Sequence, residues 1–383
     1  MFRIAVVGGG IAGTAAALFL TRAGHRVVLF ERAPALGPVG AGLLLQPSGQ
    51  EVLDALGLLA AVATRSEPIA ELRAEQVSGR SLIRLSYAAA DPEWTGYGVA
   101  RGLLFSTLLE ACHAAGVAIR PGTPIDRVAS TATAIALSGA GGKDLGAFDF
   151  AIAADGARSA LRASSGLRHR SRDYGFGALW TIGPCTAVRG YLQQVVRGTR
   201  VLVGLLPLGG GRASFFWGDR PEGIAQLRRQ GFAAFRERVL AIAPQAEEIF
   251  TEFSDFDQAA FTTYLHVAAP RWHTGRLLFV GDAAHAMSPH LGQGANLALA
   301  DAAAFARHLA GTNDFASAAD LYERERQRQV RPYSQLSWFL TPFFQSGSTI
   351  LGWGRDLALP LLAATPPLRR LMARTLAGKL RGR

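Results

Sequence analysis

The sequence predicts an α/β fold in which a parallel sheet covered by helices carries an inserted, mostly antiparallel second sheet, with helices at the C-terminus. A strand–turn–helix–strand pattern fills residues 2–32. Residues 148–155 and 276–281 are short, almost wholly apolar runs, as expected for strands covered on both faces. Residues 174–267 contain a further series of strand-like segments, which indicate a second, mostly antiparallel sheet.

The first pattern carries a glycine turn with a recognisable chemistry. Gly8 permits a tight turn out of the strand, Gly10 lets the backbone approach a pyrophosphate, and Gly13 lets the next helix pack closely. The N-terminus of that helix offers free N–H groups to phosphates. Glu31 lies 18 residues after Gly13, where a carboxylate can accept a hydrogen bond from a ribose hydroxyl. The stretch therefore predicts a Rossmann-like dinucleotide site.

The composition of the whole chain excludes several classes of protein. Its 383 residues suffice for two domains. The formal net charge of +11 is almost all arginine, and no basic run interleaved with aromatic residues predicts a nucleic-acid partner. Cys112 and Cys185 give neither a disulfide framework nor a metal-ligand spacing, so we expect no metal site and a cytoplasmic setting. Residues 4–21 are uncharged, but their glycines argue against a membrane-spanning helix.

The next elements can be placed in order. Residues 37–46 are too glycine-rich for a helix and are predicted to be extended. Pro47 then begins a helix that ends near Gly57. Strand patterns follow between residues 67 and 97, and a helix with one apolar face begins at Arg101.

In the second half, the strand-like segments of residues 174–267 are interrupted by a single helix predicted at 223–243. An alanine-rich helix is predicted at 296–309, and a charged surface helix is expected to end at Pro332. These elements divide the chain into a dinucleotide-binding domain, a substrate domain and a C-terminal helical region. The predicted boundaries are 1–67, 100–170 and 270–335 for the first, 68–99 and 171–269 for the second, and 336–383 for the third.

Two more motifs join the glycine turn. DGARSALR at residues 155–162 and GDAAHAMSPHLGQGANLALADA at residues 281–302 each follow an apolar strand. With all three segments in order, residues 2–335 resemble the class A flavoprotein monooxygenases, the aromatic hydroxylases related to para-hydroxybenzoate hydroxylase. The resemblance implies an FAD-binding domain of the GR2 type that holds FAD without a covalent bond.

The resemblance also implies roles for single residues. Glu31 would hold the adenosine ribose, and Arg101 would approach the phosphates or the ribityl chain, unless it is simply an exposed arginine at a helix start. Asp155 would serve both FAD and transient nicotinamide binding, while Asp282 would accept hydrogen bonds from ribityl hydroxyls. The implied FAD-binding residues are Gly8, Gly10, Ile11, Ala12, Gly13, Glu31, Arg32, Gln46, Arg101, Asp155, Gly281, Asp282, Pro289, Gly292, Gly294, Ala295 and Asn296.

The space in front of the flavin has fewer assigned residues, and no side chain is named as a nucleophile. Gln46 and Pro289 are expected to line it. His266, on a predicted strand of the second sheet, is a substrate-side candidate, with a plain sheet histidine as the alternative. His285 is expected to pack within the cofactor framework, with proton transfer as the alternative.

The reductant has no Rossmann motif of its own. Residues 209–211 are three glycines without a helix pattern after them, so we predict a hairpin turn. This agrees with the resemblance, which implies transient NAD(P)H binding and delivery of one oxygen atom of O₂ through a flavin C4a-hydroperoxide. The prediction is a hydroxylase of an aromatic, polyketide-like or quinone-like small molecule, with the choice between NADH and NADPH left open.

Three other functions share parts of this pattern. A flavin-dependent halogenase needs a W-x-W-x-I-P motif and a substrate-side lysine, whereas residues 180–184 read WTIGP and Lys143 is the first lysine of the chain. A prenyl-lipid reductase and a non-catalytic flavin-binding module remain alternatives.

The C-terminal region has two open interpretations. Residues 338–363 are rich in large apolar side chains, and basic residues follow up to residue 383. They form either helices docked on the FAD domain or a peripheral surface for a partner or the inner membrane face. The prolines, among them Pro342 and Pro360, exclude a continuous spanning helix. We expect a monomer or homodimer, and we expect deletion after Arg370 to spare FAD binding.

Overall fold

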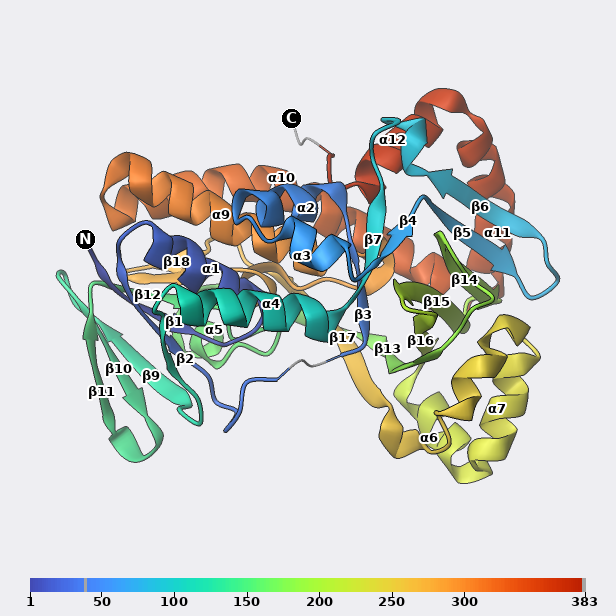
Figure 1. The fold of residues 1–383 in the computed structure, drawn as a ribbon, viewed down its shortest axis with the longest axis horizontal. Coiled ribbons are helices and arrows are strands. Elements are labelled where there is room, and N and C mark those ends of the chain that lie inside the picture. Colours follow the sequence, from blue (N-terminus) through green and yellow to red (C-terminus); the bar gives the residue numbers. More distant parts are fainter. Residues whose placement is uncertain (38–39, 381–383) are drawn as a thin grey trace.

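The computed structural model describes residues 1–37 and 40–380. Pro38 and Val39, which belong to the segment predicted to be extended, lie outside the described residues, as do residues 381–383 of the basic tail. The predicted α/β class is confirmed: a mostly parallel sheet, antiparallel sheets and C-terminal helices are all present (Figure 1).

A six-stranded sheet positions the glycine turn. Its central strand β1 pairs in parallel with β2 on one side and with β12 on the other. These strands are almost entirely buried, because helices pack on the sheet and the strands within residues 125–148 also pack on it, with the Phe148 ring 5.9 Å from that of Phe30. In sheet order the strands are β18 (His273–Thr274), β19 (Leu277–Phe279), β12 (Phe150–Ala153), β1 (Arg3–Val7), β2 (Arg26–Phe30) and β8 (Ala118–Arg120), with β18 antiparallel.

The helices of this domain begin and end close to where the sequence predicts. The first helix starts directly after the glycine turn, and Gly24 (φ +86°) follows its end. It packs against the helices α4 and α9. The helix bounds are α1 (Ile11–Arg22), α2 (Pro47–Ala55), α3 (Leu59–Ala63), α4 (Arg101–Ala114), α5 (Ala160–Ser164), α8 (Asp282–His285) and α9 (Gly294–Thr312).

Two small antiparallel sheets were not predicted as units. One joins three consecutive short strands whose outer face is exposed, so their apolar pattern is weak in the sequence. The other packs beside the large second sheet. The strands are β9 (Ile125–Ser130), β10 (Ile135–Gly139) and β11 (Asp144–Phe148) in the first, and β3 (Gly42–Leu45), β7 (Gly96–Ala100) and β4 (Glu67–Ile69) in the second.

The second large sheet has seven strands from two separate pieces of chain. Neighbouring strands are antiparallel except β14 and β5, which pair in parallel. The three glycines at residues 209–211 all have positive φ and form the predicted hairpin turn. The order is β17 (Ala260–Ala268), β13 (Arg170–Pro184), β16 (Arg212–Asp219), β15 (Val201–Gly209), β14 (Tyr191–Arg197), β5 (Glu71–Gln76) and β6 (Ser81–Ser86).

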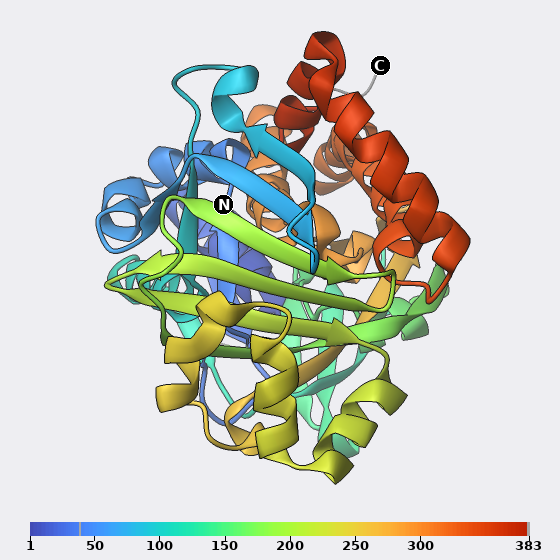
Figure 2. The same cartoon turned by 90° about the vertical axis from the view of Figure 1, so that its right-hand side faces the viewer.

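The helix predicted at residues 223–243 is wrong as a single element. The structure has α6 (Pro221–Gln230) and α7 (Phe232–Leu240), which cover one face of the seven-stranded sheet (Figure 2). Gly231 between them has φ +90°, a conformation that L residues rarely adopt and that a continuous helix does not contain. The break lets Phe232 and Phe235 enter a cluster of aromatic rings below the sheet.

The charged helix does not end at Pro332 and is not confined to the surface, so both predictions were wrong. Helix α10 (Phe315–Phe344) runs through Pro332 and Pro342, and Arg326 within it is 2% exposed. Buried contacts along this helix outweigh the cost of about 3 kcal/mol for an internal proline. Helices α11 (Thr349–Ala364) and α12 (Pro366–Leu376) follow at the edge of the molecule (Figure 2). No helix among the described residues is long and apolar enough to cross a membrane.

Candidate active site

The glycine turn combines two close packing contacts with one open position. Gly8 has φ +107°, and a Cβ there would lie 2.4 Å from the carbonyl oxygen of Ala154. A Cβ on Gly13 would lie 1.9 Å from the Gly8 carbonyl oxygen. A Cβ on Gly10 would meet nothing within 4 Å. The first two glycines are therefore required by packing, while Gly10 leaves its backbone accessible to a ligand.

A groove of about 660 Å³ starts at this turn. Glu31 lines the groove, and its carboxylate accepts hydrogen bonds from Gly9 N (2.7 Å) and Ala33 N (2.8 Å), which fix its position. Arg32 lies beside it. The groove lies beyond the carboxyl ends of the parallel strands, where ligands bind in open α/β sheets.

Asp155 forms the opposite wall of the groove. One carboxylate oxygen accepts a 3.3 Å hydrogen bond from Leu161 N, and the other is buried without a hydrogen-bond partner among the described residues. A buried acceptor of this kind costs about 1–3 kcal/mol unless a ligand or water satisfies it. Arg162, which is buried, donates to the carbonyls of Ala157 (2.7 Å) and Ala283 (2.8 Å) and so ties this motif to the third one.

A second cavity of about 360 Å³ continues from the groove. Gly10, Arg101 and Gly156 line both spaces, so one extended ligand can occupy them together. Burial lowers the pKa of Arg101, and the negative charge of Asp282 opposes that shift. The side chain of Arg101 is enclosed by protein but is reached by solvent through the cavity. Asp282, which is also exposed there, therefore faces the Arg101 cation, and this cation would also attract anionic phosphates.

The third motif builds the wall opposite Arg101. Gly281 has φ +59°, and a Cβ there would lie 3.0 Å from the Cβ of Ala12. Gly292 is left-handed (φ +61°) and ends a short turn before α9 begins. The N-terminus of α9 therefore directs free N–H groups at the cavity. The sequence-predicted residues of this wall and of the adjoining turn that line the cavity are Ile11, Ala12, Asp282, Pro289, Gly292, Gly294 and Ala295.

Two sequence-predicted residues support the cavity from behind. Asn296 is fully buried; its amide donates to the carbonyls of Leu44 and Gly292 (both 3.0 Å) and accepts from Gln46 N (2.9 Å). The Gln46 side chain is also fully buried and accepts a hydrogen bond from the hydroxyl of Tyr87. Gln46, which was expected in front of the flavin, is not among the residues that line the cavity, and its carboxamide oxygen points to Tyr87.

The two predicted histidines lie outside the cavity lining. His285 is buried and contacts Asp301, its Nε2 being 2.6 Å from Oδ2. The other Asp301 oxygen accepts a 2.6 Å hydrogen bond from Arg326 Nε. His266 lies 3.2 Å from the hydroxyl of Tyr174. His285 therefore belongs to a buried network with Asp301 and Arg326, which is consistent with packing inside the cofactor framework. His266 belongs to a separate cluster behind the cavity wall.

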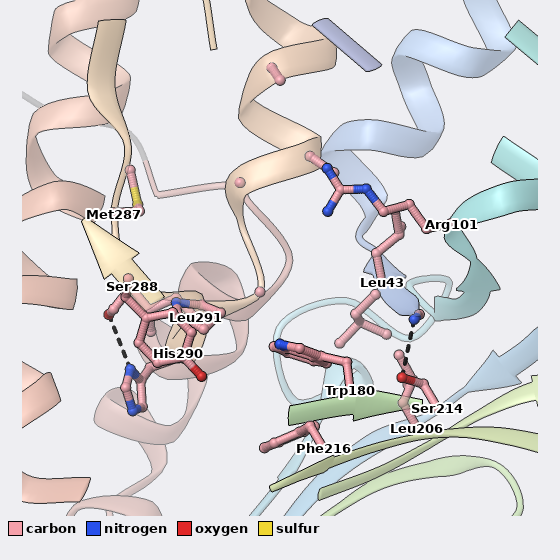
Figure 3. A pocket seen from close by; sticks show the side chains of 18 of the residues that line it. Leu43, Arg101, Trp180, Leu206, Ser214, Phe216, Met287, Ser288, His290 and Leu291 are labelled. Atoms are coloured by element: carbon pink, nitrogen blue, oxygen red, sulfur yellow. Dashed lines mark hydrogen bonds between the residues drawn. The ribbon is translucent and has the colours of Figure 1, made fainter. Parts of the chain in front are cut away.

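His290 is a cavity residue that the sequence did not single out. Its Nδ1 lies 3.0 Å from Ser288 Oγ (Figure 3), and this hydroxyl oxygen lies 2.8 Å from Thr341 Oγ1. Burial lowers the pKa of His290 to about 4, so the ring is neutral at physiological pH. The one sequence signal for His290 was its place beside Pro289 in the third motif. A histidine next to a proline belongs to no spacing pattern that would identify it as a cavity residue.

The wall facing this loop is mostly apolar and comes largely from the seven-stranded sheet, with Gln194 and Ser214 as its polar members. Trp180 and Phe216 lie side by side, with ring centroids 5.1 Å apart (Figure 3). Phe215 and Trp217 point to the opposite face, because side chains alternate along a strand, and pack against α7. The remaining apolar side chains of this wall are Leu43, Leu72, Leu192, Leu202, Leu206 and Tyr264, with Leu376 contributed by α12.

The geometry fits FAD. The groove and cavity are continuous from Glu31 to Pro289, Gly10 leaves backbone accessible between them, and Asp155 presents an acceptor without a protein partner. No group of acidic, histidine or cysteine side chains among the described residues could hold a metal ion.

Comparisons with known proteins agree with this geometry. The sequence matches the FAD binding domain family over residues 1–336. A 6-methylpretetramide 4-monooxygenase from Streptomyces rimosus is 30% identical over 79% of this chain and 73% of its own length. The ubiquinone hydroxylase UbiL from Rhodospirillum rubrum is 29% identical over 99% of this chain and 90% of its own length.

The fold has a solved counterpart. Klebsiella pneumoniae HpxO, crystallised with FAD and uric acid, superposes with a TM-score of 0.85 over 98% of this chain and 97% of that chain, at 22% identity. At this identity the likeness concerns the fold. Because the family match spans most of the sequence and the curated relatives share its activity class, the chain belongs to the FAD binding domain family and is an FAD-dependent monooxygenase.

Proposed function

We propose that this monooxygenase hydroxylates a neutral, lipophilic, fused-ring aromatic compound of the polyketide, quinone or quinolone type. The single observation that carries the proposal is the charge distribution of the cavity. Arg101 and Asp282 are the formally charged side chains among its described lining residues, and both lie on the cofactor side. A carboxylate substrate would lose its hydration without gaining a cationic partner at the apolar wall.

The residues implied by the resemblance have proposed roles at the cofactor. Glu31 accepts hydrogen bonds from the adenosine ribose, and Gly10 gives the pyrophosphate access to the N-terminus of α1. Arg101 neutralises phosphate charge, and Asp282 accepts from ribityl hydroxyls. Bound FAD supplies the electron and oxygen chemistry, with NAD(P)H as reductant and O₂ as oxidant.

The protein contributes orientation and exclusion of water. The N–H groups at the start of α9 stabilise negative charge that develops at the pyrimidine end of the flavin. Trp180 and Phe216 offer an apolar aromatic surface to the substrate ring in the cavity that Pro289 also lines. His290 accommodates a polar edge of the substrate without introducing a charge. A dry cavity favours transfer of oxygen to the substrate over loss of hydrogen peroxide.

A matched pair of compounds tests the charge argument. 1-Naphthol and 1-hydroxy-2-naphthoate share one ring system and differ in a carboxylate. We expect the naphthol, and neutral quinolones and naphthoquinols, to accelerate NAD(P)H oxidation, and the naphthoate to do so at least tenfold less efficiently. Incorporation of ¹⁸O from ¹⁸O₂ into the product reports hydroxylation directly. Efficient, ¹⁸O-labelled turnover of the naphthoate would contradict the substrate class, and unlabelled product throughout would contradict oxygen insertion.

A second proposal concerns the outer face of the C-terminal helices, which we propose contacts an anionic membrane surface. In α11, Ile350, Trp353, Leu357 and Leu361 follow helical spacing on one face and are 76%, 76%, 66% and 62% exposed. Residues 369–370 are two exposed arginines on the adjoining α12, which complement anionic headgroups. An apolar face of this kind is uncommon on a monomeric soluble protein.

Vesicle binding tests this contact. We expect co-sedimentation with phosphatidylglycerol vesicles, weaker binding to phosphatidylcholine, and loss of binding in the double variant Trp353→Ser/Leu357→Ser. Val77→Ser is the matched control, because Val77 is an exposed apolar residue (41%) at the β5–β6 turn. Failure of the wild-type protein to bind either kind of vesicle would contradict the membrane contact. A wild-type dimer that becomes monomeric in the double variant would instead assign the face to a second copy of the chain.

A further inference from the structure

A strip of arginines borders the cofactor groove. Arg158, Arg168, Arg170 and Arg172, here called the basic strip, are all exposed. Among the described residues none of the four forms an ion pair with a carboxylate within 4.0 Å. The neighbouring Asp173 uses one carboxylate oxygen to accept a 2.7 Å hydrogen bond from Gly175 N. The strip therefore carries an excess of positive charge, although Asp173 adds one carboxylate beside it.

The strip is connected to the groove by a hydrogen bond and by strand pairing. Arg158 lines the groove, and its Nη2 donates to Thr263 Oγ1 on β17 (2.7 Å). Strand β17 pairs with β13, so that Arg172 stands opposite His266. His266 lies three positions after Thr263, a distance of about 10 Å along the strand. The charges thus extend outward from the groove along β13 rather than lying on a remote face.

An aromatic surface accompanies the outer part of the strip. The Trp338 ring, 40% exposed, has its centroid 4.9 Å from that of His266 and 5.3 Å from that of Tyr174. The guanidinium of Arg172 lies 5.9 Å from the Trp338 centroid. Burial raises the pKa of the Tyr174 hydroxyl, while hydrogen bonds from Ser288 oppose the shift. Since Ser288 lines the substrate cavity, the aromatic surface lies directly behind the cavity wall.

Arginines beside an exposed aromatic plane suit one class of ligand. A nucleotide base stacks on an exposed aromatic side chain through its own π-face, and this stacking tolerates any purine. Guanidinium groups bind phosphates in a bidentate manner, which lysines do not. An adenosine phosphate therefore fits both parts of the surface at once, whereas a lipid headgroup uses the arginines but not the ring.

We propose that Trp338 and the basic strip hold the adenosine end of NADPH, with its 2′-phosphate at Arg170 and Arg172, and that this makes NADPH the preferred reductant. The proposal rests on the NAD(P)H-dependent activity and adds a site that needs no second Rossmann unit. Arg170 and Arg172 are two residues apart, about 7 Å on one face of β13, so both can reach a single phosphate with their long side chains.

The test uses the FAD-loaded, full-length enzyme and adenosine 2′,5′-bisphosphate, which carries the 2′-phosphate without the nicotinamide. We expect this compound to compete with NADPH. In Arg170→Gln/Arg172→Gln, the KM for NADPH and the inhibition constant should both rise about tenfold or more, with kcat at saturating NADPH and the FAD content retained. The KM for NADH should change less than threefold. Trp338→Leu should weaken NADPH and NADH alike.

The matched control is Arg229→Gln/Arg236→Gln, which removes the same charge from exposed positions of α6 and α7 and should leave both constants unchanged. Equal effects of the two double variants, absence of competition by the bisphosphate, or a wild-type preference for NADH would each overturn the proposal. Anaerobic flavin reduction by NADPH measures this step alone. It therefore separates failure of the nucleotide site from failure of hydroxylation, which the ¹⁸O₂ experiment reports.

Discussion

Asp301 is the charge on which the third motif depends, and its replacement by asparagine gives the sharpest prediction. Its side chain is fully buried and accepts hydrogen bonds from Gly281 N (2.8 Å) and Arg326 Nε (2.6 Å), besides its contact with His285. Asp301→Asn keeps the volume but removes the charge. The guanidinium of Arg326, itself 2% exposed, is then left buried without its counter-ion.

The expected loss of stability follows from two considerations. The charges and hydrogen bonds of His285 and Arg326 outweigh the opposing effect of burial and lower the pKa of Asp301 to about 2, from 3.8. Each pKa unit corresponds to about 1.4 kcal/mol, so the protonation balance alone contributes roughly 2–3 kcal/mol. The substitution also leaves the guanidinium of Arg326 buried without its counter-ion, and breaking a buried ion pair in this way costs about 3–5 kcal/mol. With an unfolding entropy of roughly 2.1 cal/mol/K per residue, the melting temperature should fall by about 4–6 °C.

The same shift predicts how stability depends on pH. Because the folded pKa lies below the unfolded one, Asp301 stabilises the fold above about pH 4, and this contribution disappears as pH falls toward 2. The wild type should therefore lose stability through this window more steeply than Asp301→Asn, which has no carboxylate to protonate.

The assay is thermal unfolding followed by tryptophan fluorescence, with and without FAD. Glu325→Gln is the matched control: it makes the same chemical change in α10, but at a half-exposed carboxylate paired with Arg307 and His308, where an ion pair contributes about 0–1 kcal/mol. A melting temperature for Asp301→Asn within 1 °C of the wild type would refute the reasoning. So would a drop of equal size in Glu325→Gln.

Three further predictions concern the cofactor and the tail. Acid precipitation should release all FAD into the supernatant; flavin retained in the pellet would show a covalent bond. Asp282→Ala should weaken FAD binding about tenfold or more, measured by flavin fluorescence titration, because a charged acceptor contributes about 1.5–3 kcal/mol. His285→Ala should mainly lower the melting temperature, and equal FAD affinities of these two variants would contradict the ranking. Truncation after Arg370 should increase hydrogen peroxide released per NAD(P)H, since Leu376 lines the cavity; unchanged coupling would contradict this.

The sequence predicted where the glycine turn lies relative to its strand and helix, because short-range geometry determines that arrangement. Gly8, Gly10 and Glu31 stand at fixed spacings that a strand, a turn and a helix impose, so their positions followed from the motif. The other two motifs also follow buried strands, and the register of a parallel sheet brings their ends together. The roles proposed for these residues at FAD, and the domain boundaries, stay predictions.

What the sequence missed depends on long-range contacts. The prediction that deletion after Arg370 spares FAD binding stays a prediction, but the tail does contact the site: Gln293 donates a 2.8 Å hydrogen bond to the carbonyl of Leu376 and ties the flavin-side loop to α12. No local pattern connects residues so distant along the chain. Asp301 offered a usable signal: a lone carboxylate in an apolar, alanine-rich helix must find a partner when it is buried.

The aromatic lining shows the same limit. Trp180, Phe216 and Tyr264 face the cavity, while Phe215 and Trp217 pack on the other side of the sheet. The alternation of side chains along a strand predicts that neighbouring residues point to opposite faces of the sheet. It does not predict which of the two faces lines the substrate cavity. That choice is set by α6 and α7, which cover one face of the sheet.

The residues that line the flavin groove come from segments far apart in the sequence, and this affects when the groove can form during synthesis of the chain. Residues 8–13 leave the ribosome first, but their packing partner Ala154 and the loop at 281–296 come much later. At about 5–20 residues per second, roughly 15 to 60 s separate the first and last of these segments. FAD stabilises only a chain that has completed the groove, by mass action. Flavin supplied to growing cells should therefore rescue full-length variants that are destabilised, and should do nothing for chains that stop before residue 296.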